Sequence, residues 1–216
     1  MTFSIVAFDP STGDLGIAVA SKFLAVGAVV PWARAGVGAV ATQAMANTLQ
    51  GPRGLELLSQ GVAPADAITR MLAEDEPADE VPGRQLGIVD AQGRAASHTG
   101  PACQPWAGGR TLEHVAAQGN ILSGPDVVDA MLEAYPRAAG DLADRLLAGL
   151  QAGQLAGGDR RGQQSAALLV VRQRGGFRAR NDRYLDVRVD DHPAPLEELA
   201  RLVRLWRVTF FEPSRG

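Results

Sequence analysis

The stretch Met1-Thr2-Phe3-Ser4-Ile5-Val6-Ala7-Phe8-Asp9 is the part of the chain from which the fold is best predicted. A hydroxyl residue follows the initiator methionine, and a run rich in Phe, Ile and Val, typical of a buried strand, starts directly after it. The stretch lacks a basic region followed by a long apolar segment, so we expect no leader. If Met1 is removed, Thr2 offers a hydroxyl and a free α-amine on one residue, a pair able to act as nucleophile and base.

The segments that follow predict a hairpin and further buried strands. Residues 10–14 (PSTGD) have the composition of a turn, and residues 15–21 form the second arm of a hairpin with residues 2–9. Residues 26–30 and 37–42 are two more apolar runs, which we expect to be strands joined by a turn. Because all four strands are almost continuously apolar, both faces of their sheet are expected to be covered.

The rest of the chain separates into blocks of helices and blocks of strands. In chain order, the predicted elements are helices at 54–60 and from Pro64, a hairpin of 85–90 and 94–99, an irregular segment at 100–114, a short strand at 115–118, helices beginning at a Ser123 cap and at an Asp141 cap, strands at 165–172 and 184–189, and a helix from Pro195. Segregated blocks indicate an α+β fold. Two hairpin-rich sheets with helices on their outer faces predict a four-layer αββα sandwich, in one domain spanning residues 1–216.

Composition narrows the class of function. The net charge of −3 and the pI of about 5.6 argue against electrostatic binding of nucleic acid. Cys103 is the single cysteine, which excludes an internal disulfide and a cysteine-based zinc site and fits a reducing cytoplasm. No apolar run reaches the roughly 18 residues of a membrane span. We therefore expect a cytoplasmic protein with no membrane or nucleic-acid partner, no metal and no cofactor.

Several longer motifs carry a family resemblance. They are MTFSIVAFDPSTGDLGIAVASK, AVGAVVPWARAGVGAVATQ, QLGIVDAQGRAASHTG, QGNILSG, LADRLLAGLQAG, GGDRRGQQSAALLV and LDVRVDDHP. From Met1 to about Leu205, the chain resembles the family of unknown function numbered 1028. That family is similar in fold to the N-terminal nucleophile (Ntn) hydrolases, which are αββα sandwiches. The resemblance implies the same architecture and the hydrolysis of an amide bond in a small molecule, and it defines no substrate.

Four residues are predicted to carry this chemistry, namely Thr2, Lys22, Asn120 and Ser165. Thr2 is the expected nucleophile, with its own amine as base, because an α-amine titrates near pH 8. The predicted hairpin brings Lys22 beside Thr2, where an ammonium would favour a deprotonated hydroxyl and depress the pKa of the amine. The alternatives are a tolerated hydroxyl at the start of a strand and a solvated surface lysine.

The other two predicted catalytic residues follow or precede buried strands. Asn120, or the backbone N–H of Gly119, is expected to bind a developing oxyanion. Asn at such a turn is also a common local cap. Ser165 stands at the entrance of the strand at 165–172, where its hydroxyl could support the nucleophile.

The predicted substrate-binding residues are Ser4, Gln43, Asp159 and Arg161. Ser4 shares a strand face with Thr2 and could instead be a small core hydroxyl bonded to backbone. Asp159 and Arg161 lie in a Gly-rich polar loop that leads into a strand, where Arg can bind a carboxylate or amide. The two could also pair with each other and only shape the loop.

Three functions therefore remain open at this stage. One is an Ntn-type hydrolase of a small polar amide. The second is a non-catalytic ligand-binding or assembly protein of the same fold, and a homodimer fits either function. The third is an enzyme, of cyclohydrolase type for example, that uses the loop from Asp159 to Ser165 without the N-terminus. Asp190-Asp191-His192 is interpreted as a turn that caps the last helix rather than as a metal site.

Overall fold

A computed structural model describes the backbone of residues 2–211 and the side chains of residues 2–210. One antiparallel sheet has the strand order β10-β9-β2-β1-β8-β7, and the second has the order β3-β4-β5-β6. The strands are β1 (Thr2–Asp9), β2 (Asp14–Ser21), β3 (Pro31–Arg34), β4 (Gly38–Ala44), β5 (Arg84–Asp90), β6 (Ala95–Thr99), β7 (Gly108–Leu112), β8 (Val115–Asn120), β9 (Ser165–Val171) and β10 (Arg183–Val189). The α-helices are α1 (Gln50–Ser59), α2 (Pro64–Ala73), α3 (Asp126–Arg137), α4 (Leu142–Leu155) and α5 (Pro195–Phe211). The predicted α+β class is confirmed.

Strand β1 lies inside the larger sheet, between β2 and β8. The predicted hairpin of β1 and β2 is present, with Thr2 opposite Ser21 and Asp9 opposite Asp14. Gly13 closes the turn with φ of +77°, a conformation that favours glycine. The hairpin therefore carries Thr2 to one end of the sheet and its own turn to the other.

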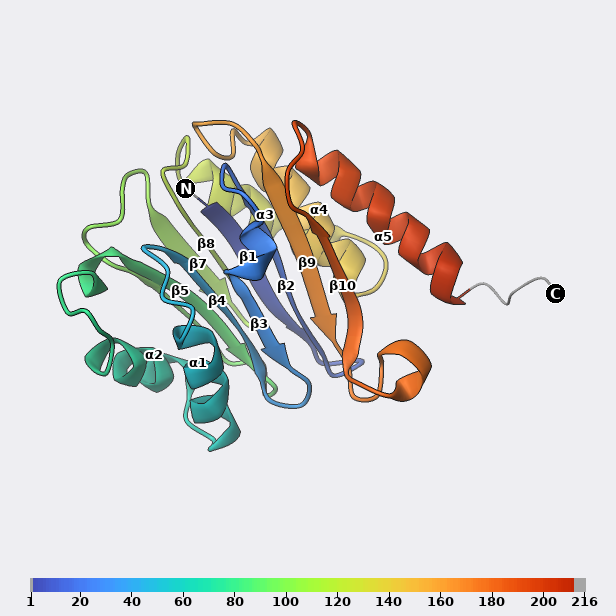
Figure 1. Cartoon of the computed structure of the whole chain (residues 1–216), viewed down its shortest axis with the longest axis horizontal. Helices are drawn as coiled ribbons and strands as arrows, with labels where there is room; N and C mark the ends of the chain where they lie inside the picture. The colour runs from blue at the N-terminus through green and yellow to red at the C-terminus, as the bar shows by residue number, and fades with distance from the viewer. Residues whose placement is uncertain (1, 212–216) are drawn as a thin grey trace.

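The two sheets stack face to face, and helices cover their outer faces (Figure 1). Phe3 and Ile5 of β1 pack towards α3 and α4, whereas Val6 of the same strand belongs to the apolar layer between the sheets. Successive residues of a strand point to opposite faces, so both faces of β1 are buried. This arrangement explains why β1 is apolar on both faces between Ile5 and Phe8.

Two local predictions are wrong. Residues 26–30 form a 3-10 turn (Val26–Ala28) and a bend, and the strand is instead β3, where a turn was expected. Val26 N donates a hydrogen bond to Ser165 Oγ at 3.1 Å, which holds this apolar segment against β9 without a ladder. The segment at 100–114, predicted to be irregular, contains the edge strand β7, which pairs with β8. Edge strands need no apolar alternation, because one side and much of one face meet solvent.

The predicted helix caps have mixed outcomes. Asp141 caps α4 as expected, since its carboxylate accepts a hydrogen bond from Asp144 N in a reciprocal capping box. Ser123 does not cap α3: the helix begins after Pro125, and no side chain caps it. In the turn before α5, Ala194 N donates to His192 Nδ1 at 3.0 Å, a contact made by the histidine rather than by the expected aspartates.

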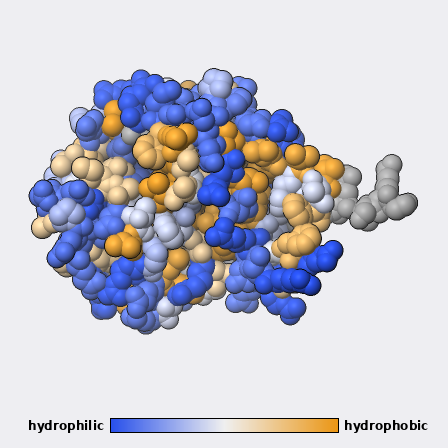
Figure 2. All heavy atoms as spheres, viewed as in Figure 1, coloured by the Kyte–Doolittle hydropathy of each residue, from blue (hydrophilic) through white to orange (hydrophobic). Residues whose placement is uncertain are grey.

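Apolar side chains are exposed on the side of the molecule nearest the C-terminus, over α5 and the β9–β10 connection (Figure 2). Phe177, Leu205 and Phe210 are each at least half exposed there. A hollow of about 820 Å³ lies between these residues and Trp206. Within the residues described, no helix combines the length and apolar character needed to cross a membrane.

Candidate functional site

A row of polar side chains crosses the larger sheet at the end where β1 begins. Ser165, Ser21, Thr2 and Asn120 are register partners on the neighbouring strands β9, β2, β1 and β8. Their side chains share the sheet face that looks towards the second sheet, because partners across a ladder point the same way. All four are buried, although polar groups at such positions are costly unless paired.

The second sheet presents its own row of polar side chains opposite this one. Gln43, Gln85 and Thr99 are register partners on β4, β5 and β6. Gln85 Oε1 accepts hydrogen bonds from Gln43 Nε2 at 2.8 Å and from Asn120 Nδ2 at 2.9 Å. Gln85 Nε2 donates to Thr99 Oγ1 at 2.9 Å, so the two rows form one network across the sheets.

Ser4 joins this network one layer deeper. Its hydroxyl donates to Gln43 Oε1 at 2.6 Å and accepts from Gln118 Nε2 at 2.7 Å. Gln118 Oε1 is buried without a hydrogen-bond partner among the described residues. Ser4 and Gln43, predicted to bind substrate, are therefore fully enclosed within this network.

Thr2 is the member of this cluster nearest to the chain terminus. It is 7% exposed, and its Oγ1 lies 3.1 Å from Ser21 Oγ in a hydrogen bond. The prediction that residues 20–22 lie beside residues 2–4 is confirmed by the register. Ser21, which sequence reasoning missed, is the residue opposite Thr2. Met1 lies outside the described residues, so its removal is not addressed by the structure.

Lys22 follows the last residue of β2 and turns to the 159–164 loop. Its ammonium donates to the backbone oxygen of Gln163 at 3.2 Å, and its backbone N donates to Asp159 Oδ2 at 2.9 Å. The described contacts of Lys22 are thus with the loop rather than with the Thr2 hydroxyl.

Asp159 organises the 159–164 loop from a buried position. Besides Lys22 N, its carboxylate accepts a hydrogen bond from Arg161 N at 2.7 Å, and Arg161 Nη2 lies 3.5 Å from it. A bridge between Leu122 and Asp159 brings the loop next to the end of β8. Asp159 therefore shapes the loop, as one of the alternatives anticipated, while the Arg161 side chain is partly exposed.

Ser165 holds the segment after β2 in place. Its hydroxyl accepts from Val26 N at 3.1 Å and donates to the backbone oxygen of Phe23. The hydroxyl therefore already donates one hydrogen bond and accepts one, and both partners are backbone groups. This geometry makes Ser165 a loop anchor within the polar row.

A pocket of about 470 Å³ opens beside Asn120. Its walls include Met45, Glu80, Cys103 and Ile121, and we refer to it as the Cys103 pocket. Burial raises the pKa of the Cys103 thiol, which makes it a poor nucleophile at neutral pH. The larger hollow over α5 is lined by aromatic residues around Trp206 and shares no residue with the polar rows, so the Cys103 pocket is the better candidate site.

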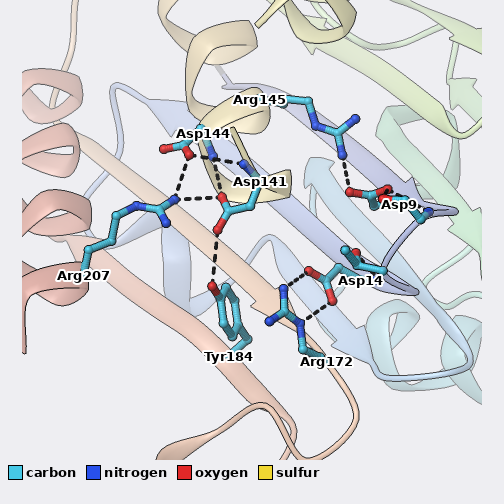
Figure 3. A network of polar contacts seen from close by, with 10 residues as sticks. Asp9, Asp14, Asp141, Asp144, Arg145, Arg172, Tyr184 and Arg207 are labelled. Atoms are coloured by element: carbon cyan, nitrogen blue, oxygen red, sulfur yellow. Dashed lines mark hydrogen bonds and ion pairs between the residues drawn. The ribbon is translucent and has the colours of Figure 1, made fainter. Parts of the chain in front are cut away.

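A second polar cluster lies at the opposite end of β1 and β2 (Figure 3). Asp14 is paired with Arg172 through two bonds of 2.7 and 2.6 Å, and Asp9 is paired with Arg145. Burial alone would raise the pKa of Asp9, but hydrogen bonds from Ser11 and the charge of Arg145 outweigh it and lower the pKa. Each carboxylate already has a cation, so this cluster braces the hairpin turn.

Gln85 and Gln118, like Ser21 and Thr99, are residues of this polar network that sequence reasoning missed. Gln85 shares the inward face of β5 with Gly87 and Val89, and Gln118 shares the inward face of β8 with Ala116 and Asn120. A polar amide at a buried strand position is itself a signal, because burial requires a partner. The partner, however, lies on another sheet.

The structure is therefore that of an α+β protein in which two antiparallel sheets stack on each other and helices cover their outer faces. Polar side chains gather between the sheets at the end where β1 begins. The chain belongs to the family of unknown function DUF1028, which matches residues 2–199. The expected family is confirmed. The structure of protein SPO2555 from Silicibacter pomeroyi, also assigned to DUF1028, is similar with 34% identity, a TM-score of 0.86, and 95% of this chain and 89% of that chain covered.

Two further solved structures match over nearly the full length of both chains. An Anbu mutant from Hyphomicrobium sp. strain MC1 has 12% identity and a TM-score of 0.43, covering 100% of this chain and 99% of that one. Anbu, described as an ancestral beta-subunit, from Yersinia bercovieri has 11% identity, a TM-score of 0.38 and the same coverage, 100% and 99%. No curated protein matches the chain.

Proposed function

We propose that the protein is a hydrolase of the Ntn type that cleaves an amide bond in a small polar molecule, with Thr2 as nucleophile. The observation that carries the proposal is the place of Thr2. Thr2 is the first residue of the strand inside the larger sheet, its hydroxyl lies 3.1 Å from Ser21 Oγ, and its register partner Asn120 lines the Cys103 pocket. The hydroxyl is thus positioned by its neighbours, one of which borders a space for a ligand.

The reaction follows from the groups on Thr2 once Met1 is removed. The free α-amine accepts the hydroxyl proton, directly or through water, while Oγ1 attacks the amide carbonyl carbon. The tetrahedral oxyanion collapses, the C–N bond breaks, and the proton passes to the leaving amine. Water then hydrolyses the resulting ester, which releases the acid and restores the hydroxyl.

Neighbouring residues would assist each step. Asn120 Nδ2 gives one N–H to Gln85, which leaves its second N–H for the oxyanion. Ser21 orients the Thr2 hydroxyl through their hydrogen bond. Lys22 and Asp159 would act by fixing the 159–164 loop, and the partly exposed guanidinium of Arg161 would bind the substrate from that loop.

The test combines the intact mass of the purified protein with labelling by a β-lactone, an electrophile that acylates activated hydroxyls. We expect the mass to lack one methionine and the lactone to acylate Thr2. Thr2→Ala should abolish labelling and Thr2→Ser should retain it, whereas Thr69→Ala, which removes an exposed hydroxyl on α2, should change nothing. Labelling that persists in Thr2→Ala, or a protein that lacks Met1 yet resists the lactone, would refute the proposal.

A non-catalytic ligand-binding protein is the second candidate. The observation that favours it is that the hydroxyls and amides of the site largely satisfy one another, as Ser4, Gln43 and Gln85 do. This function requires no free amine on Thr2. A full-length mass, together with no labelling and a retained ligand, would identify it.

A further inference from the structure

The Cys103 pocket is a preformed space between four segments of the chain. Backbone hydrogen bonds join its walls in pairs: Met45 N donates to Gly83 O at 3.1 Å, and Ile121 N donates to Gln104 O at 2.8 Å. The guanidinium of Arg84 also donates to Met45 O from beneath the wall. A pocket whose walls are tied together in this way needs little ordering when a ligand enters.

The charge of the pocket is negative. Asp79 and Glu80 line it, and none of the described residues that line it is Lys, Arg or His. Arg84 lies below and is bonded to Asp75 at 2.7 Å and to Glu80 at 3.0 Å. The carboxylates of Asp75, Asp79 and Glu80 outnumber the single guanidinium of Arg84, so this group of four side chains has two negative charges in excess. Only Oε2 of Glu80 is used by Arg84, so Oε1 remains available to a ligand.

An amide that lines the pocket also has an acceptor without a donor. Asn120 lines the pocket, is only 2% exposed, and donates through Nδ2 to Gln85 Oε1. The orientation of this amide is determined by the network: Gln85 Nε2 donates to the backbone oxygen of Gly119 at 2.7 Å, so Gln85 must present its oxygen to Asn120. Asn120 Oδ1 is then left without a hydrogen bond from any described residue. An unpaired carbonyl oxygen on a residue that lines a pocket can accept a hydrogen bond from a donor that a ligand brings.

We propose that the Cys103 pocket binds a small ligand carrying a primary ammonium or guanidinium group. The donors of that group meet Asn120 Oδ1 and the free oxygen of Glu80, and Asp79 adds long-range attraction. Met45 and Ile121 supply apolar surface for the methylene chain behind the charged head. As a binding site the pocket stands on its own. As the specificity pocket of the enzyme it rests on the proposed hydrolase function, and it then identifies the substrate as a small amide with a cationic end.

Three amides of similar length test the charge preference. They are 5-aminopentanamide with a cationic end, pentanamide with a neutral end, and glutaramate with an anionic end. Binding is measured by calorimetry with the full chain carrying Thr2→Ala, so that no turnover disturbs it. A hydrogen bond to a charged group predicts that the cationic amide binds roughly tenfold or more tightly than the neutral one. The anionic amide should bind most weakly, and added salt should reduce the difference.

Variants and one chemical probe locate the site. Glu80→Gln should bring the affinity for 5-aminopentanamide close to that for pentanamide, and Asp79→Asn should weaken it less. Glu113→Gln, a matched change of an exposed carboxylate beside β7 and β8, should have no effect. Because Cys103 is the single cysteine, its alkylation by iodoacetamide should slow when 5-aminopentanamide is bound.

The outcomes separate this inference from the proposed hydrolase function. Equal affinity for the three amides, or a cationic preference that survives both Glu80→Gln and Asp79→Asn, overturns the cation pocket. Absence of lactone labelling at Thr2 with the cationic preference intact overturns the hydrolase and leaves the pocket as a binding site.

Discussion

Substitution of Arg84 by Met removes the only cation of a buried ionic cluster in the described chain. Arg84 is 1% exposed, and its Nε lies 2.7 Å from Oδ2 of Asp75, whose side chain is fully buried. Asn47 Nδ2 also donates to Asp75, at 2.6 Å. In the Arg84→Met variant, therefore, Asp75 stays buried as a carboxylate with amide partners and no countercharge.

The magnitude follows from what is left behind. Breaking a buried ion pair by removing one partner costs about 3–5 kcal/mol, because the other charge remains desolvated. The bond from Asn47 places the expectation at the lower end, near 3 kcal/mol. Arg84→Met combined with Asp75→Asn removes the stranded charge and should recover part of this loss.

The pH dependence of the stability provides a second, independent test. Burial alone raises the pKa of Asp75, but hydrogen bonds from Arg84, Asn47 and Gln50 outweigh it and lower the pKa in the folded protein. Asp75 thus contributes stability above its unfolded pKa of about 3.9, and this is lost as pH falls through the folded value. Without Arg84, burial dominates and the folded pKa rises. The variant then loses stability as pH rises, so its deficit should be larger at pH 7.5 than at pH 4.5.

Urea unfolding followed by circular dichroism measures both quantities. Arg53→Met is the matched control, because Arg53 pairs with Glu56 and Glu74 at the surface and should contribute little. A deficit below about 1 kcal/mol at pH 7.5, or one that does not shrink at pH 4.5, would refute the argument that Asp75 is a desolvated carboxylate held by Arg84.

Three further predictions concern other parts of the molecule. Arg172→Gln should destabilise the protein by about 3 kcal/mol in urea unfolding, because Asp14 is fully buried and loses its bidentate partner; a change under about 1 kcal/mol would show that Asp14 is solvated in the variant. Gly87→Ala should lower the free energy of unfolding by about 1–3 kcal/mol and reduce lactone labelling. The added Cβ would come within 2.2 Å of the Gln118 side chain, which would then have to break its hydrogen bond with Ser4. Unchanged stability and labelling would contradict this. Alkylation of Cys103 should be slow at neutral pH and should accelerate only at a higher pH than that of an ordinary thiol, because burial raises its pKa. Fast alkylation at neutral pH would contradict this assignment.

Several features of the fold follow from local sequence patterns. The hairpin of β1 and β2 was predictable because turn residues separate two apolar runs of equal length, and Asp141 was predictable as a cap from its place before an apolar helix. The strand predicted at residues 26–30 was wrong. Their apolar character reflects burial against β9, and burial alone does not distinguish a strand from a packed turn.

The candidate site was predictable in part. Thr2 and Asn120 were identified and lie opposite each other in the ladder. Lys22 was expected beside Thr2, but a register specified to a single residue is needed to see that Ser21 takes that place. Gln85 was missed because its partners, Gln43 and Asn120, come from strands far away in the sequence.

The sequence alone determined the α+β class and the position of Thr2 at the start of a buried strand, since these depend on composition and on periodicities of a few residues, and its longer motifs carried the family resemblance. Only the tertiary structure decided that two polar rows meet across the sheets, that Ser21 touches Thr2 and that Asn120 lines a pocket with Asp79 and Glu80. The physical reason is that hydrogen bonds between side chains depend on the stacking and register of two sheets, and no local pattern encodes the distance between residues 40 or 80 positions apart.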